Sequence, residues 1–298
     1  MSMTNVRFAI PLTLLGSLIA LPAMADTTFF STGDPDGKIA TASRPDTAGK
    51  FEIESADDFI LTHSTSITDA TFTGLLSGGA TVSDIGEVVV EIYRVFPNDS
   101  DITRTSGPPT FSTSQVPTRV NSPSDVALDS RDSTSGLTFT TNDLGSFVAL
   151  NSVQPGGIHP TPGQTTGGNG EVRGEEVEFN ITFTTPFALP ADHYFFVPQV
   201  EVTTADGNFL WLSAPKPITG GTGPFVGDLQ SWTRDAALDP DWLRVGTDIV
   251  GAGTFNAAFS LSGSVIPEPS TWAMMLIGFA GLGYAGWRRA RQVSLVSG

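Results

Sequence analysis

The chain contains no cysteine among its 298 residues. This excludes disulfide bonds, thiolate nucleophiles and cysteine-based zinc sites together. Basic residues are also few, because 15 Lys and Arg stand against 31 Asp and Glu and give a net charge of -16. Since nucleic-acid affinity depends largely on Lys and Arg neutralising phosphates, we expect neither DNA nor RNA as a partner.

Short catalytic motifs are missing as well. The sequence has three histidines, and none lies in an H-x-H or H-E-x-x-H spacing. It has no G-x-S-x-G elbow of the kind that marks many serine hydrolases. We therefore predict a protein that is not an enzyme and needs no cofactor. A catalytic triad assembled from distant residues needs no local motif and stays open.

Carboxylates are numerous, and two clusters of them are visible. One is Asp57 with Asp58, and the other is Glu175, Glu176 and Glu178. A glycosidase needs two carboxyl groups about 5 to 10 Å apart across a cleft. Neighbouring residues on a strand point to opposite faces, so we interpret both clusters as solvated surface.

Between the terminal segments the sequence has no long stretch of helical periodicity. Short runs of β-branched and aromatic residues alternate instead with Gly, Pro, Asn and Asp. This pattern predicts an all-β fold, a jelly-roll-like β-sandwich that forms one ectodomain over residues 26–265. The expected strands are 51–54, 58–62, 66–76, 88–96, 136–141, 177–184, 193–202, 209–212 and 254–261.

The stretch from residue 55 to residue 76 resembles the start of β-sandwich modules found in secreted bacterial proteins. The likeness rests on Asp57, Asp58 and Phe59, which in such modules open a strand. It implies a fold element and no activity.

The segment GDPDGK matches the opening of an oxygen-ligand calcium loop through Asp34 and Asp36. It lacks the third ligand and the closing Glu of an EF-hand. A plain Asp-Gly turn is the alternative interpretation. Ca²⁺ is thus the one metal that the sequence suggests.

Three tryptophans, Trp211, Trp232 and Trp242, lie in a late region rich in Gly and Pro. Exposed together, they would form a platform on which sugars stack. Burial in the core is the interpretation that we favour, since large aromatic side chains dominate core packing.

The amino-terminal segment has the features of a secretory signal peptide. A single positive charge, Arg7, precedes an apolar stretch. Ala23 and Ala25 then form the small-residue pattern after which signal peptidase cleaves. We therefore predict a signal peptide over residues 1–25 and a mature chain that starts at the next residue.

Near the other end, residues 270–287 form an uncharged stretch of 18 residues. As a helix it would be roughly 27 Å long, close to the hydrocarbon core of about 30 Å. Arg288, Arg289 and Arg291 follow it, and positive residues tend to stay in the cytoplasm. The sequence thus predicts a single transmembrane helix over residues 270–287, with the ectodomain outside.

Pro267, Glu268 and Pro269 precede this stretch. Because proline fixes φ and cannot donate a hydrogen bond, the tripeptide should be extended. Its order with the apolar span and the basic cluster resembles the PEP-CTERM sorting signal of exported proteins from Gram-negative bacteria. The same tail is sometimes labelled ice-binding protein C-terminal, which is no evidence of ice binding.

The resemblance covers residues 266–291 and implies that an exosortase, an integral membrane enzyme, recognises and removes the tail. The residues that carry it are Pro267, Glu268, Pro269, Arg288, Arg289 and Arg291.

These features predict an exported protein that is first anchored in the inner membrane. It then reaches the cell surface or the extracellular matrix of a biofilm, where its role is structural or adhesive. Its expected partners are signal peptidase, an exosortase and extracellular polysaccharide. The alternatives are a secreted polysaccharide-active hydrolase and a calcium-stabilised carbohydrate-binding module.

Overall fold

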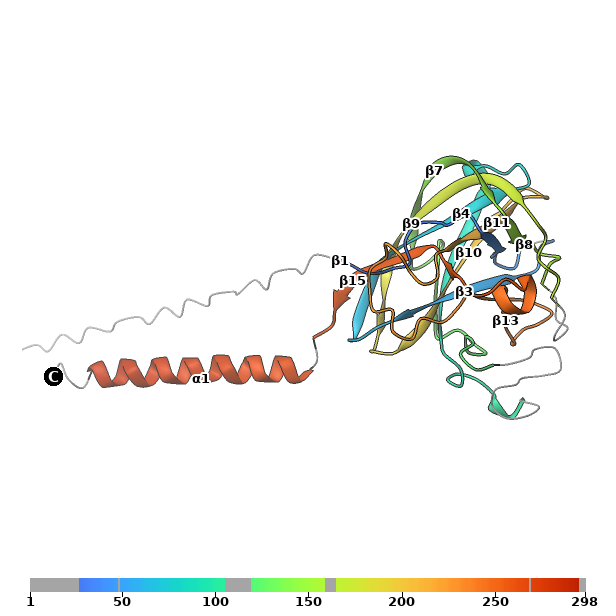
Figure 1. Ribbon diagram of the computed structural model, residues 1–298. Coiled ribbons are helices and arrows are strands. Elements are labelled where there is room, and N and C mark those ends of the chain that lie inside the picture. The colour runs from blue at the N-terminus through green and yellow to red at the C-terminus, as the bar shows by residue number, and fades with distance from the viewer. Residues whose placement is uncertain (1–26, 48, 105–118, 159–164, 268, 295–298) are drawn as a thin grey trace, which may run out of the picture.

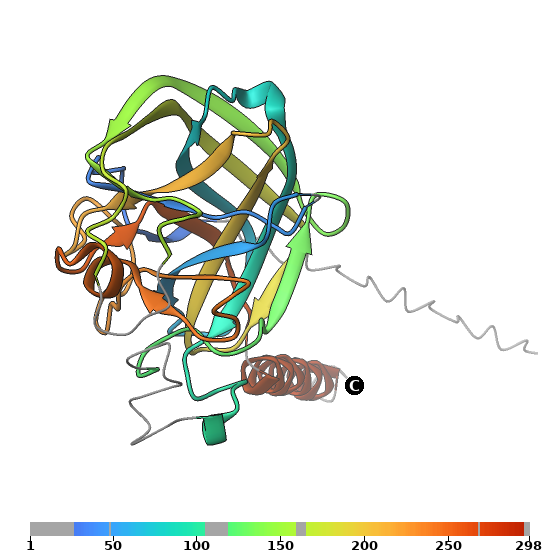
Figure 2. The same ribbon diagram turned by 90° about the vertical axis from the view of Figure 1, so that its right-hand side faces the viewer.

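The body of the protein consists of β-strands arranged in two sheets (Figures 1 and 2). The computed structural model describes residues 27–47, 49–104, 119–158, 165–267 and 269–294. The all-β prediction is confirmed by the strand content of these residues. The predicted signal peptide, with Ala23 and Ala25 at its cleavage site, lies outside them.

The larger sheet is organised around β4 (Thr65–Ser77). One edge of β4 pairs along nearly its whole length with β9 (Val172–Leu189). Its other edge is shared by β15 (Phe259–Val265) and β11 (Asn208–Ala214). The sheet also contains β1 (Thr27–Ser31), β2 (Ile39–Ala42), β7 (Thr138–Ala149), β8 (Asn151–Val153) and β14 (Asn256–Ala257).

The second sheet has six strands, in the order β13-β12-β3-β10-β5-β6. All its pairs are antiparallel. Its strands are β13 (Leu243–Arg244), β12 (Trp232–Asp235), β3 (Ile53–Ile60), β10 (His193–Val202), β5 (Ile85–Arg94) and β6 (Asp129–Asp132).

Helical structure in the described residues is limited. Two short 3₁₀ turns span Val82–Asp84 and Ile102–Arg104, and a π-helical turn spans Val245–Val250. The long helix α1 (Pro269–Ser294) follows β15. Figure 1 shows it projecting away from the two sheets.

Aromatic rings from both sheets form much of the core. Along β9 the buried residues Val177, Phe179, Ile181 and Phe183 alternate with polar ones, as the sequence pattern predicts. The ring of Phe179 stacks on Phe72 of β4, with centroids 4.8 Å apart.

Aromatic rings of the two sheets also contact each other. Phe196 of β10 stacks on Phe259 of β15 at 5.2 Å. Aromatic burial therefore links the two sheets.

Strand prediction from the sequence was right for the long apolar runs and incomplete elsewhere. The expected strands 51–54 and 58–62 are one continuous strand, β3. Asp57, Asp58 and Phe59 consequently lie inside that strand and do not open it. Six strands were missed because they are short or polar and are fixed by partners distant in the sequence: β1, β2, β6, β8, β12 and β13.

Candidate functional site

The first and last strands of the body lie side by side. β1 pairs antiparallel with β15, so Thr27 is opposite Gly263. One residue beyond β15, Ile266 N donates a hydrogen bond to the Ser64 carbonyl at 2.7 Å. The chain therefore enters and leaves the described body at the same place (Figure 1).

Beyond this point the described residues are exposed and form neither strand nor helix until α1 begins. Val265 and Ile266 are 49% and 37% exposed, and Pro267 is exposed as well. Helix α1 then begins at Pro269, which is tolerated there because the first turn of a helix needs no backbone donor. The predicted non-helical strip is thus confirmed at Ile266 and Pro267 and wrong at Pro269, which is already helical, while Glu268 lies outside the described residues.

The membrane prediction needs correction. Helix α1 covers the expected residues 270–287, yet no helix in the described parts of the chain is both long and apolar enough to cross a bilayer. The physical reason is the composition of the stretch. Four glycines, two tryptophans and a tyrosine lower the mean hydropathy of the stretch. A stretch without charges is therefore not necessarily apolar enough to span a membrane.

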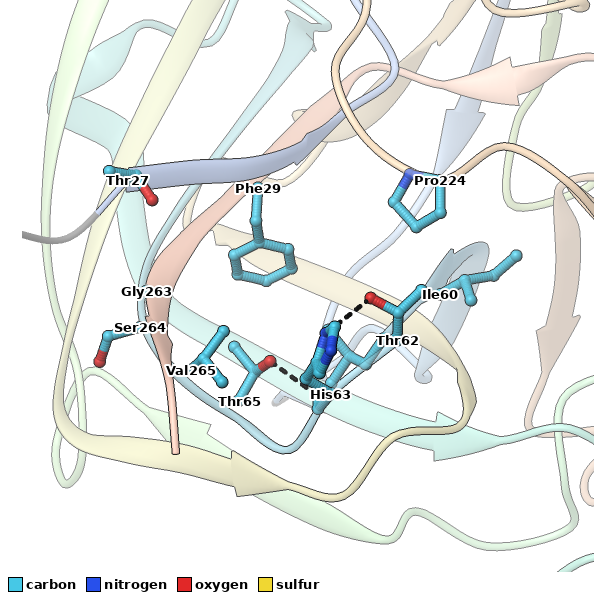
Figure 3. Close-up of a pocket in the computed structure, with 11 residues that line it drawn as sticks. Thr27, Phe29, Ile60, Thr62, His63, Thr65, Pro224, Gly263, Ser264 and Val265 are labelled. Carbon is cyan, nitrogen blue, oxygen red and sulfur yellow. Dashed lines mark hydrogen bonds between the residues drawn. The ribbon is translucent and has the colours of Figure 1, made fainter. Parts of the chain in front are cut away.

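A pocket of about 410 Å³ lies where the chain leaves the body (Figure 3). Thr62 Oγ1 and His63 Nδ1 are 3.0 Å apart at its rim, and Thr65 Oγ1 donates to the His63 carbonyl at 2.9 Å. The described residues that line it include no carboxylate, so His63 has no acid partner there. Its apolar lining comes from Phe29, Ile60, Leu61, Pro224 and Val265.

The two residues of the suggested calcium loop lie near the surface. Asp36 Oδ1 accepts a hydrogen bond from the Ser213 hydroxyl at 2.5 Å, and Lys38 Nζ lies 2.9 Å from the other oxygen. Asp34 is exposed. No group of three or more His, Asp or Glu suited to a metal occurs among the described residues. Calcium binding stays a prediction.

Asp57 and Asp58 point to opposite faces of β3, as expected, but our interpretation of them as solvated surface was wrong. Both are buried. Asp57 accepts hydrogen bonds from Ala257 N at 2.8 Å and Ser231 Oγ at 3.1 Å. Asp58 lies 2.6 Å from His193 Nε2. Burial raises the pKa of both carboxyl groups.

The second acidic cluster fits the surface interpretation better. Glu175, Glu176 and Glu178 on β9 are all half-buried. Glu178 Oε1 accepts a hydrogen bond from the Asn142 side chain at 3.0 Å. Glu178 also lines a small pocket of about 90 Å³ together with Asp34. The prediction for the tryptophans is confirmed as well. They are buried in the core, with exposed fractions of 2% for Trp211, 1% for Trp232 and 2% for Trp242.

The structure also assembles a polar cluster that sequence reasoning missed. Arg234 of β12 donates to both carboxylate oxygens of Glu54 on β3, one of them at 3.0 Å. Tyr93 of β5 donates its hydroxyl to Glu54 at 2.5 Å and lies 3.1 Å from Glu91. The guanidinium lies over the Trp242 ring, 4.3 Å from its centroid. The sequence contains one sign of this cluster: Glu91 and Tyr93 lie two residues apart on a predicted strand and therefore share one of its faces.

Burial, together with the nearby charge of Glu54, raises the pKa of Glu91 from its ordinary value of 4.5 to about 8. The folded protein therefore keeps this proton in a pH range where the unfolded chain has released it, and stability falls as pH rises from about 4.5 to 8.

We expect Glu91→Gln to remove that part of the pH dependence. Relative to the wild type, the variant should gain on the order of 3 to 4 kcal/mol between pH 5 and pH 8. Urea unfolding at several pH values measures this difference. Parallel stability profiles for the two proteins would contradict it.

The body, the exposed exit and the appended helix define a class of protein, a folded β domain that carries a separate carboxyl-terminal signal. Residues 265–291 match a family model described as the PEP-CTERM protein-sorting motif. The chain thus carries a PEP-CTERM sorting signal, which marks an exported protein sorted through an exosortase. No curated protein and no solved structure gives a significant match.

The matched range includes every residue on which the resemblance was based. It covers the tail alone. The strands and pockets of the body therefore carry the remaining functional information.

Proposed function

We propose that this protein is a non-catalytic, structural or adhesive component of the cell surface or extracellular matrix. In this proposal the body is a jelly-roll-like β-sandwich that is exported by a cleaved signal peptide. An exosortase then removes the tail. The supporting observation is the exposed, non-helical link of Ile266 and Pro267, which lies between β15 of the body and helix α1.

A link that is not helical suits processing, because a protease must hold its substrate backbone in an extended form. The body ends at β15, whose pairing with β4 and β1 is complete before Pro267. Removal of the tail would therefore leave the strand pairs of the body unchanged.

The non-catalytic part of the proposal is supported by the acidic clusters of the body. Glu54 is bound by Arg234 and Tyr93, and Asp57 is bound by a backbone N–H and a hydroxyl. Carboxylates engaged in this way are positioned for structure and do not face one another across an open cleft.

The test is the mass of the released protein from cells with and without the processing enzyme. We expect loss of the residues beyond about Pro269 only when the enzyme is present. The double variant Pro267→Ala and Pro269→Ala should remain unprocessed, because the strip is then free to continue helix α1.

Pro186→Ala is the matched control, since Pro186 is exposed on β9 and far from the motif in sequence. It should be processed like the wild type. A full-length mass in cells that contain the enzyme would overturn the sorting route, and hydrolysis of an extracellular polysaccharide by the purified protein would overturn the non-catalytic role.

A further inference from the structure

An amine, a carboxylate and a carboxamide meet in the second half of the body. Lys216 Nζ lies 2.6 Å from Asp228 Oδ2 and donates to Asn256 Oδ1 at 3.0 Å. Asn256 Nδ2 donates to the same oxygen of Asp228 at 3.2 Å. Lys216 also donates to the Leu229 carbonyl. The Oδ2 atom of Asp228 therefore contacts the side-chain nitrogen of Lys216 and that of Asn256.

The three side chains are held by the fold. Asn256 is fully buried on β14, opposite Ala214 of β11, and Lys216 follows two residues after Ala214. The side chains of Lys216 and Asp228 are only 15% and 16% exposed. Asp57 fixes β14 by accepting the N–H of Ala257. Such preorganisation keeps reacting groups in contact without further loss of entropy.

We propose that Lys216 and Asn256 react to form an intramolecular isopeptide bond, with Asp228 as the group that transfers protons. Nζ lies in contact with Oδ1, and Oδ1 is bonded to Cγ, the carbon that the amine attacks. No oxidant, cofactor or second protein is needed.

The reaction balances within these groups. Asp228 accepts a proton from the Lys216 ammonium, and the neutral amine forms a bond from Nζ to Cγ of Asn256. Asp228 then returns the proton to Nδ2, and the bond from Cγ to Nδ2 breaks. The second Nζ proton leaves through the same carboxylate, so the products are an amide and an ammonium ion. The total charge is unchanged.

The surroundings favour this chemistry. Partial burial strengthens the electrostatic effect of a positioned carboxylate. A cavity of about 430 Å³ adjoins Lys216 and Asp228 and gives ammonia a way out. A chain without cysteine has no disulfide to stabilise it outside the cell, and this bond would close the loop between β11 and β14 in the same way.

Mass spectrometry of the purified full chain tests the proposal. We expect an intact mass about 17 Da below that of the sequence, the loss of one ammonia. Fragmentation of a protease digest should yield a branched peptide that joins Lys216 to Asn256. Asp228→Asn and Asn256→Ala should both restore the unmodified mass.

Lys50→Met is the matched control. Lys50 Nζ is likewise held by several acceptors, but these are the backbone carbonyls of Val202, Thr204 and Gly207. This variant should keep the mass loss. The midpoint of thermal unfolding should fall by about 10 °C in Asp228→Asn, because an unlinked loop gains entropy on unfolding.

An unmodified intact mass in the wild type would overturn the proposal, even if Asp228→Asn were unstable. A mass loss located at a single unbranched asparagine would also overturn it, because that product is a succinimide. The bond forms within one chain, so its presence or absence is independent of the sorting route and of the proposed surface role.

Discussion

Replacing Arg234 by Met should lower the free energy of unfolding by about 3 to 5 kcal/mol. The side chain is 6% exposed and donates to both oxygens of Glu54, whose side chain is 5% exposed. Without the guanidinium, a carboxylate remains in a site from which water is excluded, and the hydroxyl of Tyr93 compensates only part of its charge. Denaturant unfolding followed by tryptophan fluorescence measures the loss.

The surface pair of Arg94 with Asp99 provides the control. Those side chains are 34% and 22% exposed, so Arg94→Met should cost less than about 1 kcal/mol. Adding Glu54→Gln to Arg234→Met should recover part of the stability, because the unpaired charge disappears. Equal losses in the two arginine variants would contradict the role assigned to burial.

Replacing Phe72 by Ala should cost about 3 to 5 kcal/mol, because it removes a ring from the centre of the aromatic core. Phe72 is fully buried and contacts Phe179 at 4.8 Å, Phe209 at 5.7 Å and Phe196 at 6.3 Å. Since these rings come from both sheets, the cavity would loosen the contact between them. The midpoint of urea unfolding should fall accordingly.

Phe51→Ala makes the same chemical change at a residue that is 46% exposed. Its ring meets the Arg44 guanidinium at 5.0 Å, a contact worth about 0.5 to 1 kcal/mol at an exposed site. We therefore expect a loss of about that size. If Phe51→Ala destabilised the protein as much as Phe72→Ala, the assignment of Phe72 to the core would be wrong.

The sorting motif was predictable because its signal is local. Pro267 and Pro269 act on the backbone around them, and their order with the apolar span and the arginines needs no knowledge of the fold. Long strands were predictable for a similar reason, since the alternation through Val177 and Phe179 depends only on neighbours along the chain. Residues 270–287 were misjudged because length, absence of charge and the arginines that follow were taken as sufficient for a membrane span, without weighing the low mean hydropathy of the stretch.

The clusters of the body could not be predicted in this way. Glu54 and Arg234 are 180 positions apart, and Lys216 and Asn256 are 40 apart. Each is an ordinary surface residue type whose burial follows from the pairing of β12 with β3 and of β14 with β11. Asp57 and Asp58 were assigned to solvent for the same reason.

By itself the sequence determined the all-β class, the absence of cysteine chemistry and the sorting signal at residues 265–291. Only the tertiary structure decided which polar residues are buried together, which rings join the two sheets and where the chain leaves the body. The physical reason is the sequence distance over which the interactions act. Composition and local motifs act within a few residues, whereas burial and long-range hydrogen bonds exist only once distant strands have paired.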